Sequence, residues 1–387
     1  MIGDVNTSAI LFDVDRYEHH CVVADSSYIE NLGRVHAADL WGSKISQACL
    51  LNNHKVVHLI LDGLDLNRVG PKFSNISYKI DMNHGDVNMF EMFGDRKDQL
   101  AIFPSQMQKL ILMAEQAYTT NEHDRSVIRG TLESVATKFY IDNRMWRENA
   151  IQNEDSLRIV GIAHEEVPKL EMFVSYLDTE YKAAVASDAK DQEQLHALSV
   201  LAVTFRNMLS NNGDLFNTTT TRVIDGAKTG RRVIYDFSRL MMRGVGVAMA
   251  QLVNVIGFAV GNLGYGDTVI IHGAENIDDG VKRYLTLQFD KLFDKGGRVI
   301  YCYNSIDKML DDKSFSEFDR ADYTIFGSMS DNQVRVYQNL LGQGIPEDLS
   351  RLITTRGEGL NYIRRGYDNV VFRRELQLGL SLRRGRQ

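Results

Sequence analysis

Short, unbroken apolar runs recur along this chain, and most are followed by a segment with helical periodicity. Within the first hundred residues the runs are 9–14, 20–25 and 55–62, and a helical pattern extends from about Val35 to Leu51. Strands that are buried on both faces are apolar throughout, and they occur in parallel sheets covered by helices. The alternation therefore predicts an α/β domain with a mostly parallel sheet flanked by helices.

The middle of the chain has a different pattern. Apolar residues repeat at helical spacing over 107–118, 127–139 and 195–209. Ser105-Gln106-Met107-Gln108 follows Pro104 and matches a capping box, which predicts that a helix begins there. We expect four or five helices and little strand between about residues 104 and 212, as an all-helical subdomain inserted into the α/β domain.

Strands and helices alternate again in the last third of the chain. The expected elements are strands at 232–237, 268–272, 298–304 and 323–326, helices at 281–292 and 332–341, and a C-terminal hairpin over 360–376. The resulting domain boundaries place the first part of the α/β domain at 1–103 and the helical subdomain at 104–215. The remainder of the α/β domain, with the hairpin and a basic tail, occupies 216–387.

One stretch is long enough to require a membrane test. Residues 244–266 carry no charge, and this length would cross a bilayer. Three polar side chains and six glycines interrupt the stretch, and a strand-like run follows it at once. We therefore expect a buried helix packed on a sheet and no transmembrane segment in this chain.

The composition is that of a globular protein, with 44% hydrophobic and 25% charged residues. The formal net charge of −7 argues against a general nucleic-acid binder, since such proteins are usually basic. The three cysteines lie far apart, without the spacing of a zinc site, and fit reduced thiols in a cytoplasmic protein. We expect no metal.

The segment from His20 to Asn31 reads as a buried strand, a loop and the approach to a helix. In P-loop ATPases this junction carries GxxxxGK[ST], whose backbone amides and lysine hold the phosphates. Here Asp25, Ser26 and Ser27 begin the loop, the lysine position reads Glu30, and the hydroxyl position reads Asn31; neither glycine is present. No GK[ST] occurs elsewhere in the chain.

Several further motifs follow in a distinctive order: Phe12-Asp13, Asp62 after a strand, Asn88-Met89-Phe90, Asp236-Phe237-Ser238-Arg239-Leu240 and Gly357-Glu358-Gly359-Leu360. In order and spacing the chain resembles the C-terminal motor domain of the VirB-four (TraC/TrbE-type) ATPases of type IV secretion and conjugation systems. The resemblance covers nearly the whole chain and implies a RecA-like, P-loop-type fold. The large N-terminal domain usual in that family has no counterpart in the sequence given, which is either a fragment of a longer protein or a reduced form.

The positions that carry chemistry in that family differ here. Its hydrolytic strand ends in Asp-Glu, whose aspartate orients magnesium and whose glutamate polarises the attacking water; His272 and Gly273 stand at these positions. The next strand ends in a glutamine that senses the γ-phosphate, and Asn304 stands there. Glu275 and Asp62 are the residual acids, although Glu275 lies two residues further along and is expected to face differently. We interpret His272 as a polar strand end, because no second zinc ligand has suitable spacing.

The size of the electrostatic interaction indicates how these differences affect nucleotide binding. Two unit charges ~4 Å apart interact by about 4 kcal/mol at an effective dielectric of ~20. Glu30 in the place of a lysine therefore changes the interaction with a phosphate by on the order of 8 kcal/mol before screening by solvent. Half of that would move a micromolar site towards millimolar affinity. We predict that ordinary Mg-ATP binding and hydrolysis are absent, and we expect no cofactor unless the degenerate site still binds ATP and magnesium.

The sequence is compatible with three functions. The first is a pseudo-ATPase that acts as a scaffold or regulatory partner in a type IV secretion or conjugation complex. It would lie at the cytoplasmic face of the inner membrane, with self-association or an active ATPase relative as partner. The second is an NTPase with an unusual site that uses Glu275, Asp62 and a neighbour's arginine. The third is a DNA-binding module that uses the arginine pairs at 364–365, 373–374 and 383–384.

Overall fold

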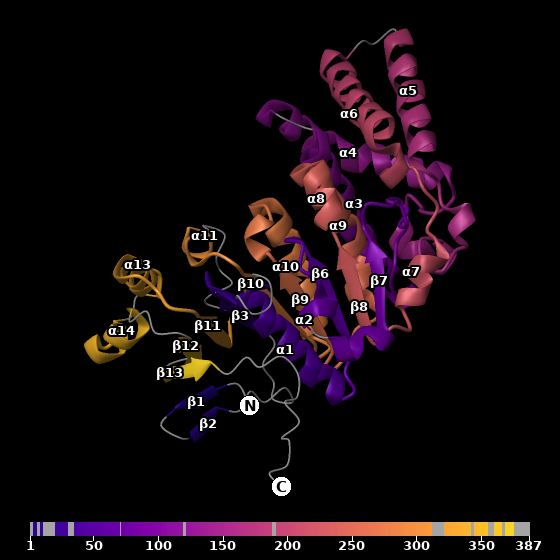
Figure 1. Ribbon diagram of the computed structural model, residues 1–387. Helices are drawn as coiled ribbons and strands as arrows, with labels where there is room; N and C mark the ends of the chain where they lie inside the picture. The colour runs from indigo at the N-terminus through magenta and orange to yellow at the C-terminus, as the bar shows by residue number, and fades with distance from the viewer. Residues whose placement is uncertain are drawn as a thin grey trace. The chain divides into compact units, whose positions relative to one another are not determined.

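The structure is a computed structural model that describes residues 3–5, 8–10, 20–29, 35–69, 71–118, 121–187, 191–311, 321–341, 344–354, 360–365 and 368–374. Most of its strands form one sheet, in the order β2-β1-β13-β12-β11-β3-β10-β9-β6-β8-β7 (Figure 1). Its central strands are β3 (His20–Ala24), β6 (Val56–Ile60), β8 (Arg232–Asp236), β9 (Thr268–His272), β10 (Arg298–Tyr303) and β11 (Tyr323–Phe326).

These six central strands pair parallel with one another. All residues of β3, β6, β9, β10 and β11 are buried, as expected for strands covered on both faces. The predicted α/β fold, with a RecA-like, mostly parallel sheet, is therefore confirmed. Strand β7 (Ser77–Asp81) follows β8 at one end of the order and was not predicted.

The other side of the sheet is antiparallel. Strands β12 (Leu360–Arg365) and β13 (Asp368–Arg374) form the predicted hairpin, and β12 pairs with β11. Beyond them lie β1 (Gly3–Val5) and β2 (Ser8–Ile10). The run 9–14 was expected among the parallel strands, but β2 pairs antiparallel with β1 and ends at Ile10, so this prediction is wrong for the residues described. Phe12, Asp13 and Gly357–Gly359 lie outside the described residues.

Helix α1 (Ala37–Leu51) packs against β3, β9 and β10. Trp41 and Ile45 belong to one buried cluster with Cys21 and Ile300 of the sheet. The helix approaches the sheet so closely that a Cβ at Gly42 would lie 2.8 Å from the Cys302 sulfur. Only glycine allows this approach without displacement of the neighbours.

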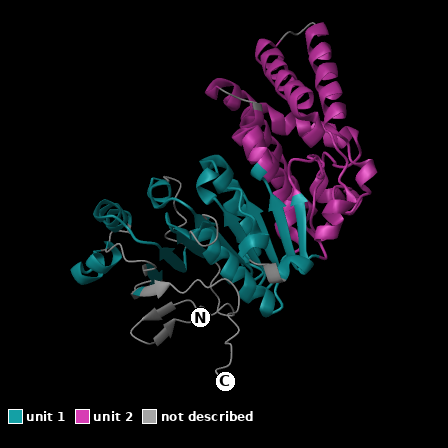
Figure 2. Ribbon diagram, in the orientation of Figure 1, with its two compact units in different colours: residues 1–80, 230–238, 263–387 teal, residues 81–229, 239–262 magenta. Residues whose placement is uncertain are grey.

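The chain forms two compact units (Figure 2). Unit 1 comprises residues 1–80, 230–238 and 263–387, and unit 2 comprises 81–229 and 239–262. Unit 1 also contains α2 (Leu66–Val69), α10 (Asp279–Phe293), α11 (Ile306–Leu310), α13 (Asp331–Leu341) and α14 (Glu347–Thr354). Unit 2 is mostly helical, with α3 (Gln99–Tyr118), α4 (Glu122–Asp142), α5 (Leu170–Ala186), α6 (Gln192–Phe216), α7 (Arg222–Ala227) and α9 (Val245–Gly261); α8 (Ser238–Arg243) begins at the last residue of a unit 1 segment.

The predicted start of α3 is wrong. The helix begins at Gln99 and continues through Pro104, so Ser105 lies inside it. Proline lacks the amide that would donate to the carbonyl four residues earlier, a loss that a helix tolerates near its start. A signal that usually marks a first turn thus lies further inside the helix here.

The uncharged stretch forms α9, and most of its side chains are buried. Its main packing partner is α3, so the prediction that it packs chiefly on a sheet is wrong. The two helices approach closely at Gly246, where a Cβ would lie 2.3 Å from the Gln116 carbonyl oxygen. Among the described residues, no helix combines the length and the apolar character needed to cross a membrane.

Candidate functional site

The carboxyl ends of the central strands bring several of the predicted site residues to one edge of the sheet. Asp25, Asn304 and His272 lie at the ends of β3, β10 and β9, which are neighbours in the sheet, and Asp62 follows β6 (Figure 1). In open α/β sheets, ligands bind at this edge. The side chains here instead form hydrogen bonds with one another.

Asn304 connects two of the acids. Its side-chain amide donates to Asp62 Oδ2 at 2.6 Å, and its backbone amide donates to Glu275 Oε2 at 3.1 Å. Gly273 has φ +72°, and a Cβ there would lie 2.7 Å from Asp62 Cβ, so this turn needs glycine. The turn brings Glu275, which the sequence suggested would face differently, back to the end of β10.

A line of buried hydrogen bonds connects two side chains of α1 through His272 of β9 and His58 of β6. Asp39 Oδ1 lies 2.8 Å from His272 Nδ1, and His272 Nε2 lies 3.0 Å from His58 Nδ1. His58 Nε2 then lies 2.9 Å from Ser46 Oγ. All four side chains are almost fully buried. We call Ser46, His58, His272, Asp39, Asp62, Asn304 and Glu275 the strand-end network.

Burial sets the protonation of the strand-end network. It raises the pKa of Asp39 and of Asp62 to about 7, and the two carboxyl groups hydrogen-bond to each other. Burial also lowers the pKa of His272 to about 4, and that of His58 well below its usual value. At neutral pH both imidazoles are therefore uncharged.

The beginning of the loop after β3 is also occupied by its own side chains. Asp25 Oδ1 accepts from the Ser27 amide at 2.9 Å and from Ser27 Oγ at 2.6 Å, while Asn361 donates to Asp25 Oδ2 at 3.3 Å. Ser26 Oγ accepts from the Ile306 amide at 3.0 Å. In a phosphate-binding loop the backbone amides are directed at the ligand, whereas here the Ser27 amide is used by Asp25.

The beginning of α1 completes the edge. The Ala37 amide donates to the Ser27 carbonyl, and β4 (Tyr28–Ile29) pairs with β5 (Val35–His36) just before the helix. Asp39 lies in the first turn, where the helix dipole favours negative charge. A buried carboxyl group therefore lies where this type of junction would hold a phosphate. Glu30 and Asn31 lie outside the described residues.

The donors at this edge do not fit magnesium and nucleotide. Among the described residues, no group of three His, Cys, Asp or Glu side chains is placed to hold a metal ion. The carboxyl oxygens of Asp39 and Asp62 are engaged with each other, with His272 and with Asn304. A Mg-nucleotide would have to break these contacts.

Two further sequence motifs have structural partners. Asp236 accepts from the Ser238 amide at 3.0 Å and pairs with Lys79 at 2.6 Å, so the D-x-S motif ends β8 and fixes the start of the next helix. In unit 2, Asn88 accepts from the Phe90 amide at 3.0 Å and donates to the Pro168 carbonyl at 3.1 Å. Both motifs therefore shape the backbone.

Comparisons with known proteins address the fold. No protein-family model and no curated protein sequence matches this chain. The structure of VirB4 of Thermoanaerobacter pseudethanolicus matches with a TM-score of 0.73 and 12% identity, over 97% of this chain and 96% of that chain. This chain has the VirB4 fold.

The plasmid coupling protein TrwB shares the fold with VirB4 and with this chain. TrwBdeltaN70 with sulphate matches with a TM-score of 0.59 and 10% identity, over 92% of this chain and 86% of that chain. TrwB in complex with ADP and Mg²⁺ matches with a TM-score of 0.58 and 11% identity, over 93% and 85% of the two chains. The resemblance found in the sequence is therefore confirmed for the fold.

Proposed function

We propose that this protein is a non-catalytic component of a type IV secretion or conjugation machine that retains a VirB4-like motor fold without nucleotide turnover. One observation carries the proposal: the strand-end network bonds the side chains at the edge of the sheet to one another. TrwB has been solved with ADP and Mg²⁺. In this chain the corresponding edge holds buried carboxyl groups and neutral imidazoles.

Electrostatics supports the same conclusion. Burial raises the pKa of Asp39, Asp62 and Glu275, and the charge of a neighbouring acid raises it further in each case, so this edge already carries an excess of acid. Each of these groups that is ionised adds about 4 kcal/mol of repulsion to a phosphate ~4 Å away at an effective dielectric of ~20. Nucleotide binding would therefore be opposed both by the charge and by the lost hydrogen bonds.

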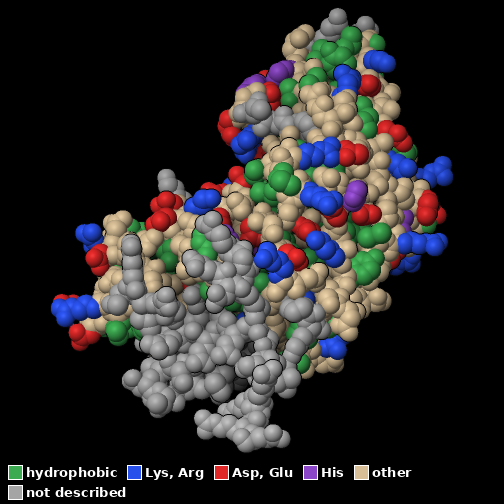
Figure 3. Space-filling model, in the orientation of Figure 1, with side chains coloured by type: hydrophobic (Ala, Val, Ile, Leu, Met, Phe, Trp, Pro, Cys, Tyr) green, Lys and Arg blue, Asp and Glu red, His purple; other side chains and the backbone are tan. Residues whose placement is uncertain are grey.

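The role that remains for such a domain is a scaffold or a regulatory partner. The partner would be a second copy of this chain or an active ATPase of the same fold, at the cytoplasmic face of the inner membrane. A role in DNA binding receives less support. Basic and acidic side chains are intermingled on the face shown in Figure 3, and the chain has a net charge of −7.

Mg-ATP at millimolar concentration should leave the thermal midpoint unchanged. A ligand at ~100 times its dissociation constant would stabilise the native state by about 2.7 kcal/mol, which a thermal melt detects easily. Mg²⁺ alone and Mg-ADP serve as matched conditions in the same assay. A rise of the midpoint that depends on nucleotide concentration would refute the proposal.

The second candidate is an NTPase with an unusual site, and one contact favours it. Asn304 hydrogen-bonds both Glu275 and Asp62, so the two residual acids meet at one residue. This candidate requires phosphate release that Glu275→Gln abolishes while Glu347→Gln, an exposed site on α14, does not. We expect no release above background from any of the three proteins, because the acids at this edge contact one another's partners and, among the described residues, no group of three His, Cys, Asp or Glu side chains is placed to hold a metal ion.

A further inference from the structure

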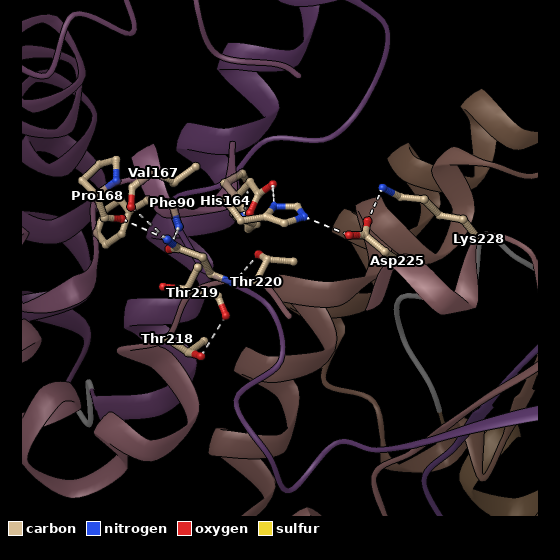
Figure 4. Close-up of polar contacts among 12 residues, drawn as sticks. Phe90, His164, Val167, Pro168, Thr218, Thr219, Thr220, Asp225 and Lys228 are labelled. Atoms are coloured by element: carbon tan, nitrogen blue, oxygen red, sulfur yellow. Dashed lines mark hydrogen bonds and ion pairs between the residues drawn. The ribbon is translucent and has the colours of Figure 1, made fainter. Parts of the chain in front are cut away.

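A second polar cluster lies in unit 2 and is centred on His164 (Figure 4). His164 Nδ1 lies 2.7 Å from Glu91 Oε1, and His164 Nε2 lies 3.2 Å from Asp225 Oδ2. Lys228 donates to the other oxygen of Asp225 at 2.6 Å. The three partners come from separate segments: Glu91 precedes α3, His164 begins a 3₁₀ turn (His164–Glu166), and Asp225 lies on α7.

The geometry determines the charge of the ring. A neutral imidazole has one N–H donor and one acceptor nitrogen, whereas an ionised carboxylate only accepts. With carboxylates at both nitrogens, a neutral ring would turn a lone pair towards an oxygen. Only the imidazolium donates to Glu91 and Asp225 together. These are charge-assisted hydrogen bonds, the stronger kind in proteins.

The direction of the His164 pKa shift agrees with this geometry. Burial lowers the pKa of His164, but Glu91 and Asp225 outweigh it, so the pKa lies above its usual value. Lys228 and then His164 hold the pKa of Asp225 low. The cluster is thus built to keep His164 protonated.

Other charged groups surround the cluster. Lys109 of α3 donates to the Glu91 carbonyl at 3.2 Å. On the turn of His164 itself, Glu165 and Glu166 follow in sequence, and Glu166 pairs with Arg158 at 2.8 Å. The two ring nitrogens of His164 contact Glu91 and Asp225, so each nitrogen already has its acceptor.

Hydrogen bonds that do not titrate join the same segments nearby. The backbone amide of Asn88 donates to Thr220 Oγ1 at 3.0 Å, and the side-chain amide of Asn88 donates to the Pro168 carbonyl. Neither of these groups gains or loses a proton in the pH range considered. These contacts keep the segments together at any pH. The contact between Asp225 and the His164 imidazolium ties α7 to the His164 turn in a proton-dependent way.

We propose that His164 is a proton-dependent latch that fastens α7 to the segment before α3. The chain passes from unit 2 to unit 1 between Thr229 and Gly230, directly after α7 and Lys228. Release of Asp225 therefore loosens the segment that leads into β8. The latch does not depend on the proposed function, because it uses residues of unit 2 alone.

The direction of the pH effect follows from linkage. The folded pKa of His164 is raised above the unfolded value of 6.5. The stabilisation is therefore complete below about pH 6.5 and is lost as the pH rises through the folded pKa. The latch is closed below about pH 6.5 and opens as the pH rises through the folded pKa of His164.

Two measurements on the full chain test the latch. NMR titration of the histidine rings should give His164 a pKa above 6.5, and Asp225→Asn should lower it by removing one carboxylate. Amide hydrogen exchange at residues 222–228, corrected for intrinsic rates, should be at least about threefold faster above the His164 pKa than below it.

Variants separate the latch from a general loss of structure. His164→Gln should make exchange at residues 222–228 fast and independent of this titration, while His84→Gln, an exposed histidine of the same unit, should leave both readouts unchanged. If His164→Gln does not fold, Asp225→Asn still tests the idea through the shifted titration. A His164 pKa at or below 6.5 would overturn the latch. So would an exchange rate at residues 222–228 that is the same above and below the His164 pKa.

Discussion

Asp39→Asn should stabilise the protein at pH 8 and change little at pH 4. The folded pKa of Asp39 is about 7 against 3.8 for the free side chain, so its ionised form is penalised in the native state. Stability therefore falls as the pH rises from about 4 to 7, and the substitution removes that loss. A shift of about three pKa units corresponds to about 4 kcal/mol. We expect about 2 kcal/mol, since Asp62 shares the proton and the amide loses the favourable helix dipole.

Urea unfolding at pH 4, 6 and 8 measures this gain. An asparagine keeps the size of the side chain and an oxygen to face His272, so the fold should persist. Asp65→Asn, an exposed aspartate near Asp62, is the matched control and should show no gain that grows with pH. A variant of Asp39 that is less stable than the parent at pH 8 would contradict the assignment of a strained, partly protonated carboxyl pair.

Lys109→Met should stabilise the protein with the opposite pH dependence. Burial lowers the pKa of Lys109 to about 7 from 10.5, so its ammonium form is penalised in the native state. That penalty is complete below pH 7 and fades as the pH approaches 10.5. Methionine removes it but also removes the bond to the Glu91 carbonyl, which costs about 1–3 kcal/mol. We expect a net gain of about 2 kcal/mol at pH 6, as for buried ions replaced by apolar side chains.

The same unfolding series at pH 6 and pH 9.5 tests the Lys109 prediction. The gain should shrink or reverse at pH 9.5, where Lys109 is neutral in the folded protein. Lys138→Met, an exposed lysine on α4 of the same unit, controls for the change in net charge. A gain that is equal at both pH values would show that packing, and not the buried charge, produces it.

The sheet was largely predictable because its strands are local patterns. Each parallel strand is a mostly apolar run of four to six residues, so it can be recognised from its own residues. Strand β7, with the sequence SYKID, was missed because it is polar and lies at one end of the strand order. The start of α3 was missed because Pro104 imitates a helix start.

The candidate site was predictable only in part, for a different reason. His272, Asp62 and Asn304 could be found because each lies at or just after the end of an apolar run. Asp39 and His58 could not be assigned to the site, because their contacts with His272 span 233 and 214 residues. The contact between Asp39 and His272 forms because α1 packs on β9, and the contact between His58 and His272 forms because β6 and β9 are neighbours in the sheet. A histidine inside the apolar run of β6 was nevertheless a signal of buried polar contact.

The contacts of His58 and His272 have one more consequence. Each imidazole faces the other through a nitrogen, so one of these two nitrogens must donate and the other must accept. If His272 carries its hydrogen on Nδ1 and donates to Asp39, then His58 must donate to His272 and accept from Ser46. If Asp39 donates instead, every hydrogen bond along the line reverses. The two rings therefore cannot choose their tautomers independently, and the loss of a proton that Asp39 donates to His272 reorients the Ser46 hydroxyl hydrogen, three hydrogen bonds away.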